Sequence, residues 1–196
     1  MIAQRRVTVD DELTLVPRNP ADAAELFAIV ERHRSSLREW LTWIDATRTA
    51  GDVRRFAQFA QSQFEGRVAF DYVVRSGPEL VGAIGLHGID WYGRSAQIGY
   101  WLSPEAVGRG ITTRAATALT SHAFDVLELN RLEIRCVVEN RRSRAVAERL
   151  GYAFEGTLAE AYFLQGVFRD IALYAMTKTR WRPLRQAQGR PSTSSG

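Results

Sequence analysis

The stretches Ala96-Gln97-Ile98-Gly99-Tyr100-Trp101-Leu102 and Val107-Gly108-Arg109-Gly110-Ile111-Thr112 decide the fold of this chain. The first is an apolar run of strand length, and the glycines of the second lead into a helical pattern from Thr112 to Leu127. Another apolar run surrounds Ile134. A strand, a long helix and a second strand form a crossover, so we expect these two strands to be parallel and adjacent.

The flanking sequence extends this unit in both directions. Apolar periodicity predicts further strands near residues 13–16, 70–74, 80–86, 162–164 and 170–174. It predicts helices that begin at Asn19 and Asp52, and another from about Ser143 to Leu150. The expected order is β-α-α-β-β-β-α-β-α-β-β. This order predicts a mixed α+β fold in which about four helices pack on one sheet.

Length and composition favour one ordinary globular domain. The chain has 196 residues, of which 45% are apolar and 24% are charged. No run reaches the roughly 18 apolar residues that a membrane span requires. The first residues are not followed by an apolar stretch of signal-peptide length. We therefore expect a cytoplasmic protein without membrane contact.

The basic character of the sequence is concentrated at its end. Five of the 26 lysine and arginine residues lie in the last 19 residues, which hold no acidic residue. The chain before them is nearly neutral, which argues against a specific nucleic-acid surface. We predict one domain over residues 1–181 and a disordered basic, serine-rich tail over residues 182–196.

The residues that bind metals or form disulfides are few. Cys136 is the single cysteine, and its apolar surroundings favour a buried structural thiol over a nucleophile. The histidines His33, His87 and His122 lack the spacing of metal ligands. We expect no metal site.

The glycine loop has the features of an anion site at the start of a helix. The first turn of a helix leaves N–H groups unpaired at the positive end of its dipole. Gly108 and Gly110 permit close approach of the backbone. The spacing matches neither a Walker loop nor the complete dinucleotide fingerprint. On these residues alone, a glycine turn without a ligand remains an equal alternative.

Several motifs in order resemble the GNAT N-acetyltransferases, and more narrowly the Rim-type branch that acetylates the amino termini of ribosomal proteins. The resemblance covers about residues 13–181. The motifs that carry it are Ile98-Gly99-Tyr100-Trp101-Leu102, Gly108-Arg109-Gly110-Ile111, Glu139-Asn140 with Ser143, Arg149-Leu150-Gly151-Tyr152, Trp40-Leu41-Thr42-Trp43, Gly85-Leu86-His87-Gly88-Ile89-Asp90-Trp91 and Gly166-Val167-Phe168-Arg169-Asp170.

The resemblance implies a central, mostly antiparallel sheet with a splayed parallel strand pair, and acetyl-CoA as cosubstrate. It implies that the glycine loop holds the pyrophosphate and that pantetheine lies along the preceding strand. The chain departs from the family pattern at Val107, where a polar residue is usual, and at Thr112, where a small one is usual. The implied cofactor-binding residues are Tyr100, Trp101, Leu102, Val107, Gly108, Arg109, Gly110, Ile111, Thr112, Thr113, Asn140 and Ser143.

The implied chemistry is direct attack of a primary amine on the thioester. By resemblance, Asn140 contacts pantetheine and Ser143 protonates the departing thiolate. Helix capping is the alternative for both, since Asn and Ser are preferred N-caps, but one serine hydroxyl can cap and still donate a proton. The attacking amine needs a base or a water relay. Related enzymes offer a glutamate where this chain has Tyr162, and Glu160 is the nearest carboxylate. If residues 160–164 are extended, Glu160 and Tyr162 share a face; a solvated surface glutamate is an equal alternative.

The acceptor is less determined than the cofactor. Trp40, Trp43, Asp90 and Trp91 are candidates for the substrate cleft, with Asp45 or Asp90 attracting an ammonium; core packing is the competing interpretation of the tryptophans. The resemblance favours an N-acetyltransferase, an acyltransferase that modifies the N-terminal α-amine of a ribosomal protein. Acetylation of a polyamine or aminoglycoside and a catalytically impaired CoA-binding module are the alternatives. By resemblance we also expect a homodimer.

Overall fold

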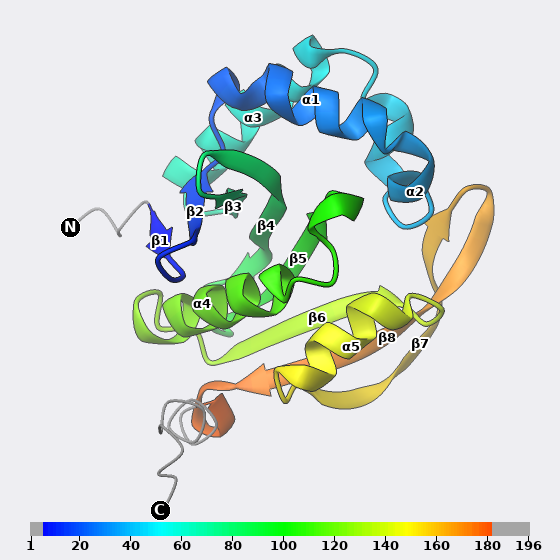
Figure 1. Ribbon diagram of the computed structural model, residues 1–196. Helices are drawn as coiled ribbons and strands as arrows, with labels where there is room; N and C mark the ends of the chain where they lie inside the picture. The colour runs from blue at the N-terminus through cyan, green and yellow to red at the C-terminus, as the bar shows by residue number, and fades with distance from the viewer. Residues whose placement is uncertain (1–5, 182–196) are drawn as a thin grey trace, which may run out of the picture.

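The computed structural model describes residues 6–181 and contains one sheet with the strand order β1-β2-β3-β4-β5-β6-β8-β7 (Figure 1). The strands are β1 Val7–Thr8, β2 Leu13–Pro17, β3 Phe70–Ser76, β4 Glu79–Asp90, β5 Ser95–Leu102, β6 Arg131–Val137, β7 Ala153–Leu164 and β8 Val167–Thr177. The α-helices are α1 Ala23–Arg32, α2 Arg34–Arg38, α3 Ala50–Glu65, α4 Ile111–Asp125 and α5 Arg141–Arg149. Short 3₁₀ helices are η1 Pro20–Asp22, η2 Thr42–Ala46 and η3 Pro104–Ala106.

The sheet is antiparallel at every junction except one. β5 and β6 run parallel, and α4 lies in the crossover between them. The predicted mixed fold, with its mostly antiparallel sheet and parallel pair, is therefore confirmed. The single domain over residues 1–181 remains a prediction, and the predicted tail lies outside the described residues.

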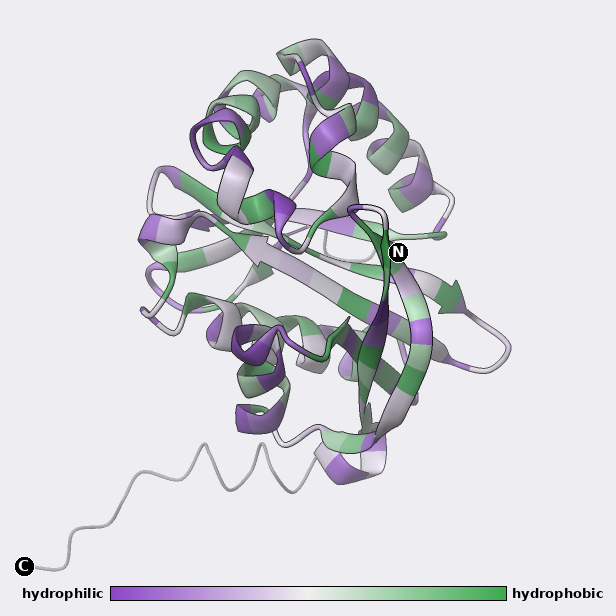
Figure 2. Cartoon of the chain, turned by 90° about the vertical axis from the view of Figure 1, so that its right-hand side faces the viewer, coloured by the Kyte–Doolittle hydropathy of each residue, from purple (hydrophilic) through white to green (hydrophobic). Residues whose placement is uncertain are grey.

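Helices cover both faces of the sheet (Figures 1 and 2). On one face, Leu26 of α1 and Val53 of α3 pack against Val73 and Leu80. On the opposite face, α4 and α5 bury their apolar sides in the larger core, which includes Leu15, Tyr72, Ile98, Leu119, Phe124, Leu132 and Val146. The two faces of β5 are thus in contact with different helices.

The parallel pair is closed at only one end. Its register runs from Ser95↔Arg131 to Ile98↔Ile134 and then stops. Beyond that point β5 stays paired with β4 as far as Leu102, and β6 stays paired with β8 as far as Val137. The strands therefore separate, and residues 99–102 and 135–137 border an opening in the sheet.

The capping residues predicted for the helices are found in the structure, but two of the helices begin at other residues than predicted. Asn19 does cap a helical turn, because its side chain accepts from the Ala21 N–H, but that turn is η1. α3 begins before Asp52: Thr49 is its N-cap, and the carboxylate of Asp52 accepts from the backbone of Thr49 in a capping box. The expected αL cap at Gly151 is present, with φ of 75°.

The connection between the first two predicted helices contains additional structure. It folds as α2 and η2, so the described part of the chain has more helices than the four expected. The two-residue strand β1 was not predicted either. Both are too short to show an apolar period, so sequence periodicity does not detect them.

Candidate functional site

The glycine loop takes the conformation that only glycine adopts readily. Gly108 has φ of 87° and Gly110, the N-cap of α4, has φ of 71°. A Cβ atom added to either residue would meet nothing within 4 Å. The backbone angles, rather than crowding, require glycine here. The same finding shows that the space above the loop is open.

The start of α4 has unpaired donors. Within the described residues, the N–H groups of residues 108–113 make no hydrogen bond, and no side chain caps the helix. These N–H groups lie at the positive end of the helix dipole. Together they can bind an anion with more than one charged oxygen, such as a diphosphate.

Two arginines border this loop and are joined to the β1–β2 turn. The Arg114 guanidinium lies 2.9 Å from the Asp10 carboxylate and 3.1 Å from that of Glu12. Arg109 lies 3.4 Å from Glu12, and both groups are about half exposed. Arg109 can therefore turn toward an anion at small cost, since an exposed pair contributes little. Thr112 and Thr113 are partly exposed in the first turn of α4.

The sides of the opening bring residues of β5 and α5 together. The Tyr100 hydroxyl lies 3.1 Å from both the main-chain oxygen and the Oγ of Ser143. Asn140 is the N-cap of α5, and its Oδ1 accepts from the Ser143 N–H at 3.1 Å. Capping is thus found for Asn140, whereas the Ser143 hydroxyl faces Tyr100. Leu102 packs against the same core as Tyr100, and Trp101 packs on the opposite face.

Burial keeps the neighbouring titratable groups neutral. Burial raises the pKa of the Tyr100 phenol, and it also raises the pKa of the Cys136 thiol. Cys136 is 7% exposed, in agreement with the expected buried thiol, and it interacts with the Ser143 hydroxyl. A neutral phenol and a neutral hydroxyl in contact can pass a proton to a group placed in the opening.

The segment expected to supply the base is not extended where it was assumed to be. Glu160 has φ of 49°, and the β7–β8 register shifts between Leu158 and Tyr162. The Glu160 N–H donates to Asp170 Oδ1 at 2.8 Å, which fixes this bulge. The premise that Glu160 and Tyr162 share a face of a regular strand is therefore wrong. Glu160 is exposed, whereas Tyr162 is partly buried.

The four candidates for the substrate cleft separate into two groups. Trp43 packs against Trp101 with the two rings tilted and their centroids 5.8 Å apart, and Trp40 packs near the end of β6. Asp90 and Trp91 lie instead at the β4–β5 turn, at the opposite end of β5. There the Asp90 carboxylate accepts from the N–H groups of residues 92 and 93. The Trp91 indole N–H donates to the residue 67 carbonyl.

A pocket of about 230 Å³ lies where β6 ends. One wall comes from the segment after α2, and the other from the tip of the β7–β8 hairpin. The Gln165 amide donates to the Arg38 carbonyl at 2.6 Å and joins these walls. The pocket is lined by Glu39, Trp40, Val137, Glu139, Leu164, Gln165 and Arg169. It therefore offers two carboxylates beside an apolar surface.

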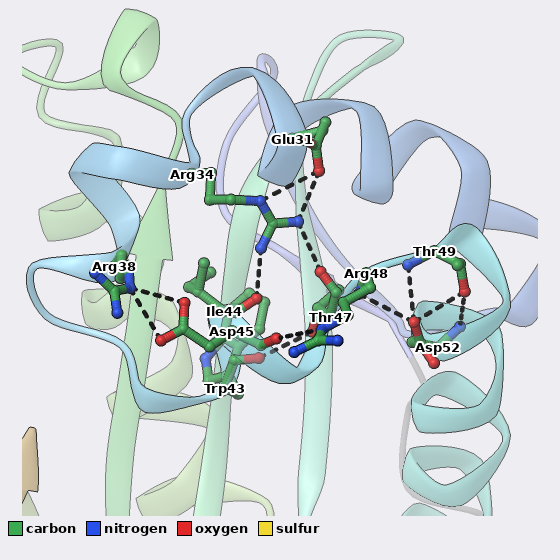
Figure 3. A network of polar contacts seen from close by, with 10 residues as sticks. All are labelled: Glu31, Arg34, Arg38, Trp43, Ile44, Asp45, Thr47, Arg48, Thr49 and Asp52. Atoms are coloured by element: carbon green, nitrogen blue, oxygen red, sulfur yellow. Dashed lines mark hydrogen bonds and ion pairs between the residues drawn. The ribbon is translucent and has the colours of Figure 1, made fainter. Parts of the chain in front are cut away.

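A polar network holds the segment that carries Trp43 (Figure 3). The Arg34 guanidinium donates to the carbonyls of Ile44 and Thr47, at 2.6 and 2.7 Å. Asp45 accepts from the Arg38 Nε through both oxygens, at 2.7 and 2.9 Å. Asp45, considered as an attractor for ammonium, is thus already paired. A hollow of about 510 Å³ beside this network is lined by Glu31, Arg34, Asp45 and Arg48, which belong to the same network.

One residue near the opening was missed by sequence reasoning. His87, considered as a metal ligand and quoted within a motif but given no catalytic role, lies on β4 opposite Gln97, two pairs beyond Gly85↔Gly99. Its imidazole rests over Gly85 and Gly99, at the point where β5 and β6 separate. The alternation of β4 places residues 85 and 87 on one face, but the contact with Gly99 depends on strand register.

The described residues contain no cluster of three or more side chains able to hold a metal ion. None of the helices in that part of the chain is long and apolar enough to cross a membrane.

Comparison with known proteins gives consistent matches. The profile of the family described as "Acetyltransferase (GNAT) domain" matches residues 12–153. The putative ribosomal N-acetyltransferase YdaF of Bacillus subtilis is 32% identical over 180 residues, covering 88% of this chain and 95% of the relative. The ribosomal-protein-serine acetyltransferase of Escherichia coli is 32% identical over 150 residues, covering 76% and 84%.

Solved structures agree over nearly the whole chain. The microcin C7 self-immunity acetyltransferase MccE, in complex with acetyl-CoA and AMP, has a TM-score of 0.85 at 26% identity, covering 90% of this chain and 98% of that one. RimL, a ribosomal L7/L12 α-N-protein acetyltransferase in complex with coenzyme A, also has a TM-score of 0.85 at 26% identity, covering 88% and 97%.

Proposed function

Because this chain belongs to the GNAT acetyltransferase family and is an acetyl-CoA-dependent N-acetyltransferase of the Rim type, we propose that its acceptor is the N-terminal α-amine of a ribosomal protein. The relatives named for ribosomal proteins support this acceptor. The observation that carries the proposal is the pocket at the end of β6, which adjoins the opening and has carboxylates beside an aromatic ring. An ammonium and the first side chain of a peptide would find complementary surfaces there.

The unpaired donors at the start of α4 fit the cofactor. We propose that the N–H groups from Gly108 to Thr113, with the side chain of Arg109, hold the pyrophosphate. The free edge of β5 at residues 100–102 has N–H and C=O groups that can pair with the amides of pantetheine. Acetyl-CoA supplies the acetyl group as a thioester. Asn140, as the cap of α5, fixes the wall beside that arm.

Ser143 is the proposed proton donor to the departing sulfur. Its hydroxyl is held 3.1 Å from the Tyr100 hydroxyl, and neither group is charged at neutral pH. Tyr100 orients the serine and can replace its proton. The contact depends on the separation of β5 from β6, which lets Tyr100 reach α5.

The acceptor side of the proposed site consists of Glu39, Glu139, Trp40 and Trp43. The two carboxylates line the pocket and attract a positively charged amine. Arg169, 3.9 Å from Glu139, is available to the carbonyl or carboxylate groups of a peptide. Tyr162 packs against the same small apolar cluster as Trp40. Asp90 and Trp91 lie at the other end of β5, and we leave them out of the acceptor site.

Mass spectrometry of acceptor panels tests this function. The purified chain is given acetyl-CoA with peptides that begin with serine or alanine, the same peptides with a blocked N-terminus, and spermidine. We expect acetylation of free peptide termini, no reaction with blocked ones, and release of one thiol for each acetyl group. Preference for spermidine would instead show a small-amine acetyltransferase. The two carboxylates that line the pocket would also suit such an acceptor.

We further propose a homodimer in the cytoplasm, where ribosomal proteins are made. β7 is an edge strand of the sheet, and phenylalanines of the β7–β8 hairpin are 55 to 60% exposed. Exposed apolar side chains beside a free edge are a typical contact surface. Light scattering after size-exclusion chromatography should give twice the mass of 22.1 kDa. A monomer at micromolar concentration contradicts the pairing.

A further inference from the structure

On the face of the opening opposite Ser143, the imidazole of His87 lies over Gly85 and Gly99. A Cβ atom built on Gly85 would lie 2.9 Å from the Nε2 of His87, and one built on Gly99 would lie 3.4 Å from its Cδ2. Any larger residue at position 85 would displace the ring. The imidazole can therefore rest over this part of the sheet because Gly85 lacks a side chain, whereas a Cβ atom on Gly99 would be in ordinary van der Waals contact with the ring. The His87 side chain is 44% exposed.

A carboxylate faces the same imidazole. Asp71 on β3 has its Oδ1 3.8 Å from His87 Nε2, which is within ion-pair distance and longer than a hydrogen bond. The Asp71 side chain is 12% exposed. A carboxylate on one side of an imidazole holds the proton on that nitrogen and leaves a lone pair on the other. The arrangement is that of a base and its orienting group.

The other charged groups near this pair lie on the neighbouring segment. Arg18, which follows β2, is 8% exposed and interacts electrostatically with Asp71 and Asp22. Its Nε is buried and lacks a hydrogen-bond partner among the described residues. Arg18 therefore places a positive charge near Asp71. Gln97, opposite His87 on β5, is uncharged.

The position of His87 relative to the reaction rests on the proposed cofactor site. The phosphates are assigned beyond the carboxyl end of β5, so an arm that runs back along β5 reaches the vertex of the opening at Gly99. Ser143 and Tyr100 lie on the α4 and α5 face of that vertex. His87 lies on the opposite face, where Trp101 and Trp43 pack. The reacting carbonyl would therefore have a proton donor on one face and a proton acceptor on the other.

We propose that His87 is the base that deprotonates the acceptor amine, and that Asp71 is its positioning residue. Glu160 is the competing carboxylate, but its backbone is fixed in a bulge by Asp170 on the hairpin. His87 is the group that the sheet itself directs to the vertex. The aspartate touches the histidine and not the acceptor.

The acceptor enters as an ammonium and loses two protons in the reaction. His87 takes the first, which passes to solvent. The freed nitrogen lone pair forms the N–C bond, and the electron pair of the thioester C–S bond leaves with the sulfur. The second nitrogen proton balances the one that Ser143 gives to that sulfur. The products are an amide, a free thiol and one proton, so no oxidant or further reactant is needed.

The main test substitutes His87→Gln, which keeps the size and polarity of the side chain but cannot take the proton. With acetyl-CoA and a peptide that begins with serine, we expect kcat/KM at neutral pH to fall about 100-fold, the lower range for general-base catalysis. The affinity for acetyl-CoA should stay within twofold. The defect should shrink as the pH rises above about 8, because a peptide α-amine then loses its proton in solution.

Asp71→Asn tests the positioning role. It should lower kcat about tenfold with little change in KM, and Asp71→Glu should restore part of the loss. The matched control is His33→Gln, which removes another imidazole that faces a carboxylate, 2.8 Å from Glu105, at the end of α1. This control should keep activity within twofold.

The outcome separates this inference from the acceptor proposal. A His87→Gln rate within threefold of wild type, or a defect of the same size at every pH, overturns the role of His87 while leaving the acceptor intact. If the wild type acetylates spermidine instead of the peptide, the acceptor proposal fails, and the same comparison is made with spermidine. If it acetylates neither, acetyl-CoA hydrolysis is compared: a slower His87→Gln supports the base, and an equal rate refutes it.

Discussion

At one end of the β5–β6 pair, residues 95–98 and 131–134 are joined in register, whereas at the other end residues 99–102 and 135–137 have separated. The closed end is sealed by the Asn130 N–H, which donates to the Arg94 carbonyl at 2.7 Å, and by ion pairs of Arg131. The open end holds the Tyr100–Ser143 contact and the imidazole of His87. The two strands thus provide stability where they pair, and where they separate they leave room for chemical groups from β4, β5 and α5.

If this division is right, damage to the closed end should lower stability and leave activity intact. Leu132 is fully buried and pairs with Ala96 and Met176 on its two neighbours. Leu132→Ala should lower the free energy of unfolding by about 3 kcal/mol, through lost apolar contact and a cavity. Urea denaturation measures this loss. An equal loss of acetyl-CoA affinity in the folded protein would break the comparison.

Damage to the open end should have the opposite effect. Ser143→Ala removes the proposed proton donor and should lower turnover about 100-fold, with acetyl-CoA affinity and the urea midpoint unchanged. Single-turnover kinetics measures the turnover, thermal shift with acetyl-CoA measures the affinity, and urea denaturation measures the stability. Ser62→Ala, which removes a hydroxyl that donates to the Phe59 carbonyl on α3, is the control. Turnover at the wild-type rate would refute the role of Ser143.

The glycine loop sharpens the same contrast between function and stability. Gly110→Ala places a side chain at φ of 71°, where an L-residue is strained by about 1–2 kcal/mol. Relaxation of that strain turns the N–H groups of α4 away from the anion, and acetyl-CoA affinity should fall about tenfold by calorimetry. Gly77→Ala is the matched control, because Gly77 has φ of 56° in the β3–β4 turn and is equally open. Equal affinities in both variants would contradict the assignment.

A smaller effect concerns pH at the closed end. Burial lowers the pKa of His122 on α4, so the unfolded chain binds its proton more readily than the folded chain. Stability that is present above the ordinary histidine pKa is therefore lost as the pH falls through it. Urea midpoints at about pH 7 and about pH 5 should show a larger loss for the wild type than for His122→Gln. Parallel losses would show that another group is responsible.

The smallest effect is expected at the surface of the closed end. Arg131 is paired with Glu133 and Glu155, at 2.9 and 2.5 Å, but these groups are 15 to 40% exposed. Arg131→Met should cost less than about 1 kcal/mol, and the cost should shrink further in high salt. Denaturation at two ionic strengths checks this. A loss of unfolding free energy comparable to that of Leu132→Ala would show that the ion pairs, rather than the core, hold β5 and β6 together.

The sequence was most informative where a repeating pattern or a special backbone angle was involved. Apolar periodicity predicted the order of the main elements, and the crossover predicted the parallel pair. The glycine loop was found because Gly108 and Gly110 must take positive φ angles. The resemblance to known acetyltransferases added the cofactor, which an anion site alone does not identify.

The sequence was least informative where the site depends on strand register or on single side chains. Asp90 and Trp91 lie close to His87 in the sequence but occupy the turn, while His87 reaches the opening. The bulge at Glu160 is set by Asp170 on the next strand, which periodicity does not encode. The shape of the segment around Trp43 depends on Arg34, a residue that any surface helix would tolerate (Figure 3).

The glycines under His87 limit which substitutions can occur at these positions during evolution. A methyl group at position 85 would lie 2.9 Å from the imidazole and 3.1 Å from the carboxylate of Asp71. The three residues therefore cannot be exchanged one at a time without loss. The Phe70 carbonyl lies 2.9 Å from the same methyl position, so glycine is required at position 85 whether or not a relative keeps the histidine. Position 71 is different: relatives that have lost the histidine should be free to replace the aspartate.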